Sequence, residues 1–249
     1  MKKSILFALL GVLTSFSMWA QDLNSTDSNG LKQGRWQTYF GNNDIETEGN
    51  YVDDVKQGVW KTYHSKGLLK SVEHYKDGVL QGVVVEIDSR GYLLSEVEYV
   101  DGEKEGLEKR YQQAGRLLSE IYYKGGVYHG TYTKYYMNTK KQEEFSYKNG
   151  EKDGVARWFY DNGEVSAEYT YENGAIQGRM TTYYKEGGIK SLGNFKDSEF
   201  DGAYQEFDPE GKLVLEGQYV NGKKEGSWIT YDAEGKVLNK EKYRGGEKN

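Results

Sequence analysis

Nine glycines recur every 24 residues along most of the chain, and this spacing constrains the fold more than any other feature. They are Gly34, Gly58, Gly82, Gly106, Gly130, Gly154, Gly178, Gly202 and Gly226. A fixed period of this length is typical of repeat architectures, in which one small unit is copied and stacked on its neighbours. We number each residue of a unit by its distance from this glycine, which is position 0.

Aromatic residues accompany the glycine at two positions of the unit. Position 5 is aromatic in eight of the nine units, with Ile87 as the exception, and position 17 is aromatic in all nine. Position 11 is aliphatic in eight units. Position 14 is glutamate in six units, namely Glu48, Glu96, Glu120, Glu144, Glu168 and Glu216. Two short apolar runs interrupted by glycine indicate β-strands, because glycine every few residues is costly in a helix interior.

Turn sequences separate the two runs of each unit. One turn reads Asp-Gly or Asn-Gly, as in Asp77-Gly78 and Asn221-Gly222, and the other carries glycine at position 9 in seven units. Asp-Gly and Asn-Gly suit tight hairpin turns because both central residues need a positive φ. Each unit therefore predicts a β-hairpin. The whole chain predicts an all-β fold, an elongated single-layer antiparallel meander of about nine 24-residue hairpin repeats with about 18 strands.

The alternation of side chains along a strand predicts which positions share a face. Position 2 is often large, as in Trp36 and Trp60, and it lies three residues before the aromatic residue at position 5. Strict alternation places the two on opposite faces. Either both faces carry aromatic residues or a bulge re-aims one of them. In the second strand, alternation places positions 11 and 17 on one face and the glutamate at position 14 on the other.

The stretch from Tyr219 to Tyr231 reads Tyr-Val-Asn-Gly-Lys-Lys-Glu-Gly-Ser-Trp-Ile-Thr-Tyr. It resembles the bacterial MORN-repeat variant, the repeat of the YwqK-type antitoxin-like family. Glu168 to Gly174 resembles the second half of the same repeat. The resemblance covers residues 30 to about 246. It implies an elongated, twisted antiparallel sheet that serves as a scaffold or accessory domain, and the antitoxin-like name implies a bound partner.

Residues 1–20 have the composition of an export signal. Lys2 and Lys3 precede a short apolar stretch, and Ala20 is a small residue before a cut at Gln21. This pattern predicts a signal peptide. The mature protein would then be periplasmic or extracellular.

The rest of the chain divides into three segments. Residues 21–29 are polar and predict a flexible leader, residues 30–246 hold the nine repeats, and residues 247–249 predict a frayed tail. The chain has no cysteine, so disulfides cannot stabilise it. Its net charge is −6, which argues against binding to nucleic acid and to anionic lipid, and we expect no peripheral membrane contact.

No residue pattern indicates catalysis or a metal site. The three histidines, His64, His74 and His129, are scattered, and neither a P-loop nor a Gly-x-Ser-x-Gly motif occurs. Glutamates at position 14 would lie about 10 Å apart, two strands on, which is too far to share one calcium ion. We therefore expect no catalytic residue, no metal and no cofactor, and we expect these glutamates to form a solvated face with cross-strand Lys or Arg partners.

Position 2 supplies the candidate partner-binding residues. It varies between units, and a surface adapted to a partner varies in this way, although relaxed packing does too. The large residues at this position are Trp36, Trp60, Tyr132, Tyr204 and Trp228. We predict an exported, non-catalytic repeat protein that binds or scaffolds an unknown protein partner in the cell envelope. The alternative is a glycan- or cell-wall-binding repeat module that uses exposed aromatic residues on a polysaccharide.

Overall fold

The computed structural model describes residues 22–249, and the predicted signal peptide lies outside them. These residues form one open antiparallel sheet of 24 strands. Nine hairpins make up most of it: β2 (Lys32–Tyr39) with β3 (Ile45–Val52), β4 (Val55–Tyr63) with β5 (Leu69–Lys76), β7 (Gly82–Ile87) with β8 (Leu93–Val100), β9 (Glu103–Gln112) with β10 (Arg116–Lys124), β11 (Val127–Tyr135) with β12 (Lys141–Lys148), β14 (Gly154–Phe159) with β15 (Val165–Glu172), β17 (Gly178–Tyr183) with β18 (Ile189–Lys196), β20 (Gly202–Phe207) with β21 (Leu213–Val220), and β22 (Lys223–Tyr231) with β23 (Val237–Arg244).

Short elements complete the sheet. Six strands have two residues each: β1 (Ser25–Thr26), β6 (Val79–Leu80), β13 (Glu151–Lys152), β16 (Ala175–Ile176), β19 (Glu199–Phe200) and β24 (Glu247–Lys248). A single 3-10 turn, η1 (Gln113–Gly115), replaces the loop of the fourth hairpin. No helix among residues 22–249 is long and apolar enough to cross a membrane.

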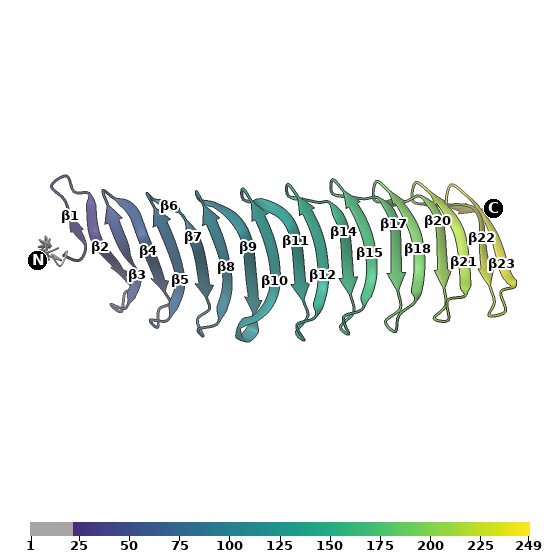
Figure 1. The fold of residues 1–249 in the computed structure, drawn as a ribbon, viewed down its shortest axis with the longest axis horizontal. Coiled ribbons are helices and arrows are strands. Elements are labelled where there is room, and N and C mark those ends of the chain that lie inside the picture. Colours follow the sequence, from purple (N-terminus) through teal and green to yellow (C-terminus); the bar gives the residue numbers. More distant parts are fainter. Residues whose placement is uncertain (1–21) are drawn as a thin grey trace, which may run out of the picture.

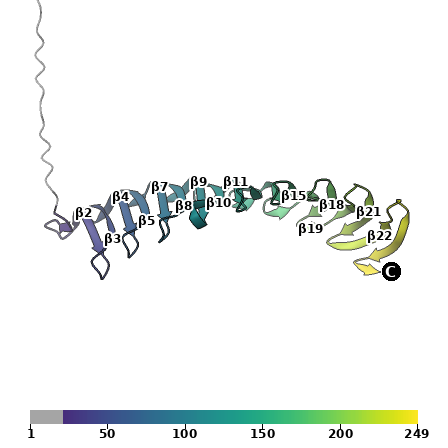
Figure 2. The ribbon, with the colours of Figure 1, turned by 90° about the horizontal axis from the view of Figure 1, so that it is seen from below.

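The hairpins stand side by side along one axis, with the two ends of the sheet far apart (Figure 1). Figure 2 shows that the sheet is a single layer that twists along its length, as right-handed strand twist requires. The predicted all-β, single-layer meander of nine hairpins is therefore confirmed.

Two-residue turns, five of them Asp-Gly or Asn-Gly, join each hairpin to the next and define one long edge of the sheet, the turn edge. In these turns both central residues have positive φ, for example 50° and 79° at Asp77 and Gly78, as the sequence predicts. The loops at positions 6 to 10 define the other long edge, the loop edge. There position 9 also has positive φ, including 66° at both Asn43 and Thr139, the two units that lack glycine at this position.

The glycine at position 0 has positive φ in all nine units and sits in a bulge where consecutive hairpins meet. Between the second and first units, Gln57 pairs with Asn50 and Lys61 pairs with Glu48. Gly58 and the two residues after it therefore lie opposite Gly49 alone. Such a bulge needs a left-handed residue, which glycine adopts without strain. The bulge turns the position 2 side chain toward the preceding hairpin.

The two faces of the sheet differ in character. The aromatic face carries positions 2, 4, 13, 15 and 17, because Trp36 pairs with Gly49 and contacts Tyr51. The carboxylate face carries positions 1, 3, 5, 14 and 16, because Tyr63 at position 5 hydrogen-bonds to Glu48 at position 14. Of the two alternatives left open by the sequence, the first holds, since both faces carry aromatic residues.

The predicted face of position 11 is wrong. Strict alternation would place Leu69 with Tyr75 at position 17. Instead the register shifts between Thr62 and Tyr63, so that Leu69 pairs with Tyr63 on the carboxylate face. The same shift recurs in the other hairpins, for example at Tyr231, because a bulge inserts one extra residue into each second strand.

Residues expected to be flexible are paired at both ends of the sheet. In the predicted leader, β1 pairs with β2, and the Asn24 side chain donates to the Gln37 carbonyl at 2.9 Å and accepts from its N–H at 2.6 Å. In the predicted tail, β24 pairs with Tyr243 and Arg244 of β23. Backbone pairing and this side-chain amide satisfy groups that a polar composition alone does not reveal.

Candidate binding faces

On the aromatic face, the position 2 ring of one unit packs on position 15 of the unit before it. Trp60 covers Gly49 so closely that a Cβ on this glycine would lie 2.2 Å from the ring. Trp228 covers Gly217 in the same way, with a corresponding distance of 2.3 Å. The absence of a side chain at position 15 therefore makes room for the indole.

Side-chain size at positions 2 and 15 is complementary along the sheet. Gly193 lies beside Tyr204 and Met180, and a Cβ there would lie 3.3 and 3.4 Å from them. Where position 15 is large, as in Tyr169, its partner at position 2 is Ala156, which is only 1% exposed. Tyr132 and Phe145 are an exception, because two large rings stack there with their centroids 5.7 Å apart. Elsewhere the variation at position 2 is matched by variation inside the sheet, as close packing requires.

A lysine at position −2 covers the rings in five units. The ammonium of Lys56 lies 4.6 Å from the ring centres of both Trp60 and Tyr75, and Lys224 lies 4.1 Å from Trp228. Such cation–π contacts favour burial of the rings while the charged group reaches water. The ladder of rings is therefore screened from solvent on its outer side.

The structure places the five predicted contact residues within this ladder. Trp60 and Trp228 are 6% and 3% exposed, so a partner cannot reach them, and their role is packing. Trp36, Tyr132 and Tyr204 are half-buried, and each contacts a neighbouring ring, Tyr204 edge-on to Tyr219 at 5.6 Å. Sequence reasoning failed for Trp60 and Trp228 because it did not anticipate the compensating glycines two strands away.

The fourth unit replaces the position 2 ring by a carboxylate. Glu108 is 3% exposed and accepts hydrogen bonds from the Tyr123 hydroxyl at 2.6 Å, from Lys104 at 3.0 Å and from Arg110 at 3.1 Å. Burial favours the protonated form of Glu108, but these bonds outweigh it and hold its pKa below the ordinary value. Burial and Glu108 together raise the pKa of Tyr123.

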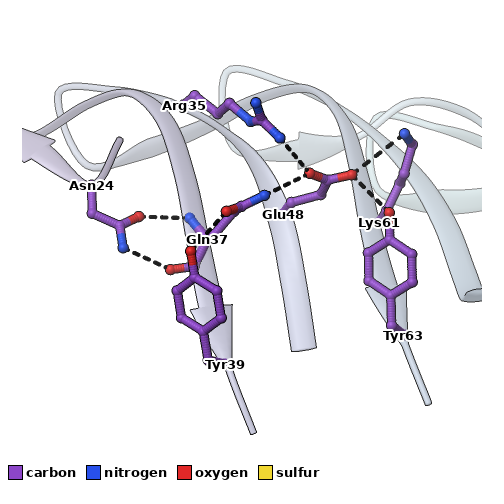
Figure 3. Close-up of polar contacts among 7 residues, drawn as sticks. All are labelled: Asn24, Arg35, Gln37, Tyr39, Glu48, Lys61 and Tyr63. Atoms are coloured by element: carbon purple, nitrogen blue, oxygen red, sulfur yellow. Dashed lines mark hydrogen bonds and ion pairs between the residues drawn. The ribbon is translucent and has the colours of Figure 1, made fainter. Parts of the chain in front are cut away.

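The carboxylate face is organised by glutamates at position 14. Glu48 accepts from Arg35 at 3.1 Å and Gln37 at 3.0 Å on one oxygen, and from Tyr63 at 2.7 Å on the other, which also faces Lys61 at 3.5 Å (Figure 3). The Tyr63 hydroxyl and the Gln37 amide are the main groups that hold the pKa of Glu48 at about 2. Burial and Glu48 raise the pKa of Tyr63 to about 12.

The same tyrosine–glutamate pair recurs across neighbouring units. Position 5 of one unit donates to position 14 of the unit before it in the pairs Tyr111–Glu96, Tyr135–Glu120 and Tyr231–Glu216, at 2.6 to 2.8 Å. The predicted Lys and Arg partners are present as well, as in Lys109–Glu96. The tyrosine partners were missed, although their constant spacing of 15 residues is visible in the sequence.

Three shallow grooves repeat on the carboxylate face, each between two adjacent hairpins. They hold about 440, 340 and 230 Å3, and each is lined by positions 1, 14, 15 and 16 of one unit and positions 1 and 3 of the next. All three occur where position 15 is glycine, at Gly49, Gly193 and Gly217. The first is the most charged, with Arg35, Lys61 and Glu48 in its lining.

Exposed valines gather at the turn edge of the carboxylate face in the N-terminal part of the sheet. Six of them, which we call the valine zone, are between 38% and 53% exposed: Val52, Val55, Val59, Val79, Val83 and Val100. The same positions in later units are mostly charged or small, for example Arg179 and Ser227 at position 1 and Glu151 and Glu199 at position −3, and only the single valines Val127 and Val220 are exposed there. An apolar patch concentrated in one part of a regular array is typical of an interaction site.

Metal ligands do not cluster in the described part of the chain. No group of three or more His, Cys, Asp or Glu among residues 22–249 is arranged to hold a metal ion. His64 and His74 instead hydrogen-bond to the carbonyls of Ile87 and Gln81, at 2.9 and 3.0 Å.

Comparison with solved structures gives only remote likenesses. A TcdB2–TccC3–TEV crystal structure is 13% identical, with 83% of this chain and 12% of that chain covered and a TM-score of 0.22. The Photorhabdus luminescens Tc holotoxin pore is 12% identical, with 85% and 13% covered and a TM-score of 0.19. The chain thus spans only about an eighth of the length of these two chains. Likenesses this weak carry no argument here.

Comparison with curated proteins finds no match. Comparison with protein families gives a match in six of the nine units. The family described as MORN repeat variant matches residues 56–77, 104–124, 152–173, 176–197, 200–221 and 224–244. These matches begin at position −2 and end at position 18 or 19, where the turn to the next hairpin begins, so they coincide with the hairpins of the structure. Because they span just over half of its residues, the chain belongs to the MORN repeat variant family.

Proposed function

We propose that this protein is a non-catalytic binding protein whose valine zone contacts another protein. The observation that carries the proposal is the valine zone itself, six exposed aliphatic residues gathered at one edge of an open sheet. Membership of a repeat family that is generally non-catalytic supports a binding role. Repeat sheets offer long surfaces to partners, and buried aliphatic area drives most protein association.

Export to the periplasm or the cell exterior is part of the same proposal. It rests on the basic start, the short apolar stretch and Ala20 in the first 20 residues. Mass spectrometry of the protein from its own cells tests it: we expect a mature chain that begins at Gln21 in the exported fraction. An intact N-terminus in the cytosolic fraction would contradict export.

Affinity capture with matched variants tests the protein-binding role. The full chain is used as bait for envelope extract, and each captured protein is purified and its affinity for the bait measured directly. The double variant Val59→Asp with Val83→Asp places charges in the valine zone, and Ala203→Asp with Ser227→Asp changes the same position 1 in the eighth and ninth units. We expect the first variant to lose the partner and the second to retain it.

Two outcomes would count against this role. Equal capture by both double variants would exclude the valine zone as the contact surface. Retention of polysaccharide alone would favour the glycan-binding alternative, which needs exposed rings that Trp60 and Trp228 do not provide.

A further inference from the structure

A cleft opens on the aromatic face between the second and third units, beside the loop edge. It has a volume of about 360 Å3, and its lining comes mainly from β4, β5, β7 and β8. Thr62, Lys70 and Glu86 supply polar groups, Ile87 contributes its backbone carbonyl, which faces the His64 ring, and Leu94 supplies an apolar side chain. The valine zone lies on the opposite face at the other long edge, so the cleft is a separate feature.

The hydroxyl pair that closes the equivalent position in the first unit is broken here. Positions 4 and 13 face each other across a hairpin, and in the first unit Thr38 and Thr47 share a hydrogen bond at 2.7 Å. In the second unit Ser71 donates instead to Glu73 at 3.2 Å. The hydroxyl of Thr62 is therefore left without a hydrogen-bond partner among residues 22–249.

Other polar groups around the cleft also keep spare hydrogen-bonding capacity. Glu86 accepts from the Ser95 hydroxyl at 2.9 Å on one oxygen and has its second oxygen available. Lys70 is exposed and forms no ion pair with the described residues. The cleft thus presents a hydroxyl, an ammonium and a carboxylate oxygen within one small volume, which is a mixture of donors and acceptors.

The mixture of charges selects among ligand classes. An anion would meet the carboxylates of Glu73 and Glu86, and a simple cation would meet Lys70. A neutral polyol satisfies both kinds of group, because each of its hydroxyls both donates and accepts. The exposed side chain of Leu94 suits the C–H face of a sugar ring. The volume lies at the low end of small-molecule sites, which range from about 300 to 1,000 Å3.

We propose that this cleft binds one pyranose residue of a neutral glycan. Thr62 and Lys70 would donate to ring hydroxyls, the free oxygen of Glu86 would accept from one, and Leu94 would lie against the ring. The proposal is independent of the protein-binding role, since it uses other residues on the other face.

Saturation-transfer NMR of the full chain with glucose, galactose, mannose and N-acetylglucosamine, each added separately, tests the proposal. We expect transfer to at least one of these sugars. Thr62→Val and Glu86→Gln should each weaken its binding about tenfold, because the first removes a hydrogen bond to the ligand and the second removes the charge that strengthens one. Thr182→Val and Glu206→Gln alter the same position 4 in the seventh and eighth units and should leave binding unchanged.

Two results would overturn the sugar site: no transfer to any of the four sugars, or equal binding by the cleft variants and their controls. Circular dichroism checks the fold of each variant. Lys70→Met changes only an exposed side chain and should also weaken binding, so it serves if another cleft variant fails to fold. Val59→Asp with Val83→Asp should not affect sugar binding, so the two proposed functions fail separately.

Discussion

The two halves of the sheet are copies of one unit, yet they are held together differently. From Tyr132 to Tyr243, ring contacts pass from unit to unit without a break. In the N-terminal half the rings of Trp36, Tyr51 and Trp60 form a short group, and among residues 22–249 no ring contact joins it to the later ladder. Between them, Val84, Val97 and Glu108 occupy the ladder positions.

The two halves also differ in the residues that they expose. The half with the interrupted ladder carries both the valine zone and the polar cleft, whereas the half with the continuous ladder presents charged or small residues at most of the equivalent turn-edge positions, with Val155 and Val220 as exceptions. Binding surfaces are commonly drawn from the less stable parts of a structure. The comparison suggests that the C-terminal half supplies rigidity and the N-terminal half supplies contact surface.

Removing one buried indole from each half gives the largest expected effect. Trp60→Ala and Trp228→Ala should each cost about 3–5 kcal/mol, because both rings are buried and their removal leaves a cavity in the ladder. Hydrogen exchange should rise mainly before Glu108 for the first variant and along the later ladder for the second. Uniform changes over the whole chain in both variants would remove the distinction between the halves.

Glu108 marks the boundary between the halves, and its charge should matter to stability. Glu108→Gln weakens charge-assisted bonds to Lys104, Arg110 and Tyr123 and should cost about 1.5–3 kcal/mol in urea unfolding. Glu164→Gln, at an exposed loop residue, serves as the control and should stay within about 0.5 kcal/mol. An unchanged midpoint for Glu108→Gln would show that the buried carboxylate contributes nothing net.

Adding a methyl group to the glycines under the two indoles shows how much stability each ladder loses when it is overpacked. Gly49→Ala and Gly217→Ala each place a methyl group into an indole and should cost about 1–3 kcal/mol. Gly58→Ala meets no atom within 4 Å but has a φ of 69°, so only backbone strain of about 1 kcal/mol is expected. A larger loss for Gly58→Ala than for Gly49→Ala would contradict the packing argument.

Low pH should destabilise the two halves unequally, with a smaller effect than the substitutions above. Glu48, Glu96 and Glu108 in the N-terminal half have lowered pKa values, about 2 for Glu48, and all three lie within the sheet. In the other half Asp161 and Glu241 also have lowered pKa values, but Asp161 lies in an exposed loop and Glu241 in the last long strand, so they affect fewer neighbours. A carboxylate with a lowered folded-state pKa stabilises the fold above its unfolded value, near 4.5, and this contribution is lost as the pH falls toward 2. Hydrogen exchange, corrected for intrinsic rates, should therefore increase in the N-terminal half first between pH 4.5 and pH 3.

High pH tests the tyrosine–glutamate pairs through the tyrosine hydroxyls instead of the carboxylates. Tyr63, Tyr111 and Tyr135 have pKa values raised to about 12, so their stabilisation is complete below the ordinary value of 10 and is lost as the pH rises toward 12. Tyr63→Phe should reduce this loss when the urea midpoint is measured at pH 8 and pH 11. An equal loss in wild type and variant would exclude the tyrosine–glutamate pair as its source.

The regular parts of the fold could be predicted from the sequence because they depend on local rules. Turn pairs such as Asn221-Gly222 and the aromatic residues at positions 5 and 17 indicate the hairpins directly. The face of Leu69 could not be predicted, because a bulge changes the side-chain parity without leaving a sequence mark. The pairing of Asn24 with the first long strand was missed for a similar reason, since a single side-chain amide makes it.

The candidate sites were harder to predict because they depend on contacts between units. The burial of Trp60 follows from Gly49, and neither residue is informative without the register that brings them together. The valine zone is visible in the sequence only as scattered valines, and it becomes a patch when positions −3, 1 and 18 meet at one edge. A comparison of each position across all nine units would have shown that valine is most frequent there in the second and third units.

Because the left-handed glycine recurs at the start of every unit, the length of the sheet is set by the number of units. This glycine fixes how each hairpin docks on the one before, so whole units can be duplicated or deleted without changing which side chains face which side. Each such event would move the two ends apart or together by about 10 Å, the width of two strands. Gene duplication could thus adjust the reach of this protein in equal steps while both surfaces of the early units stay intact.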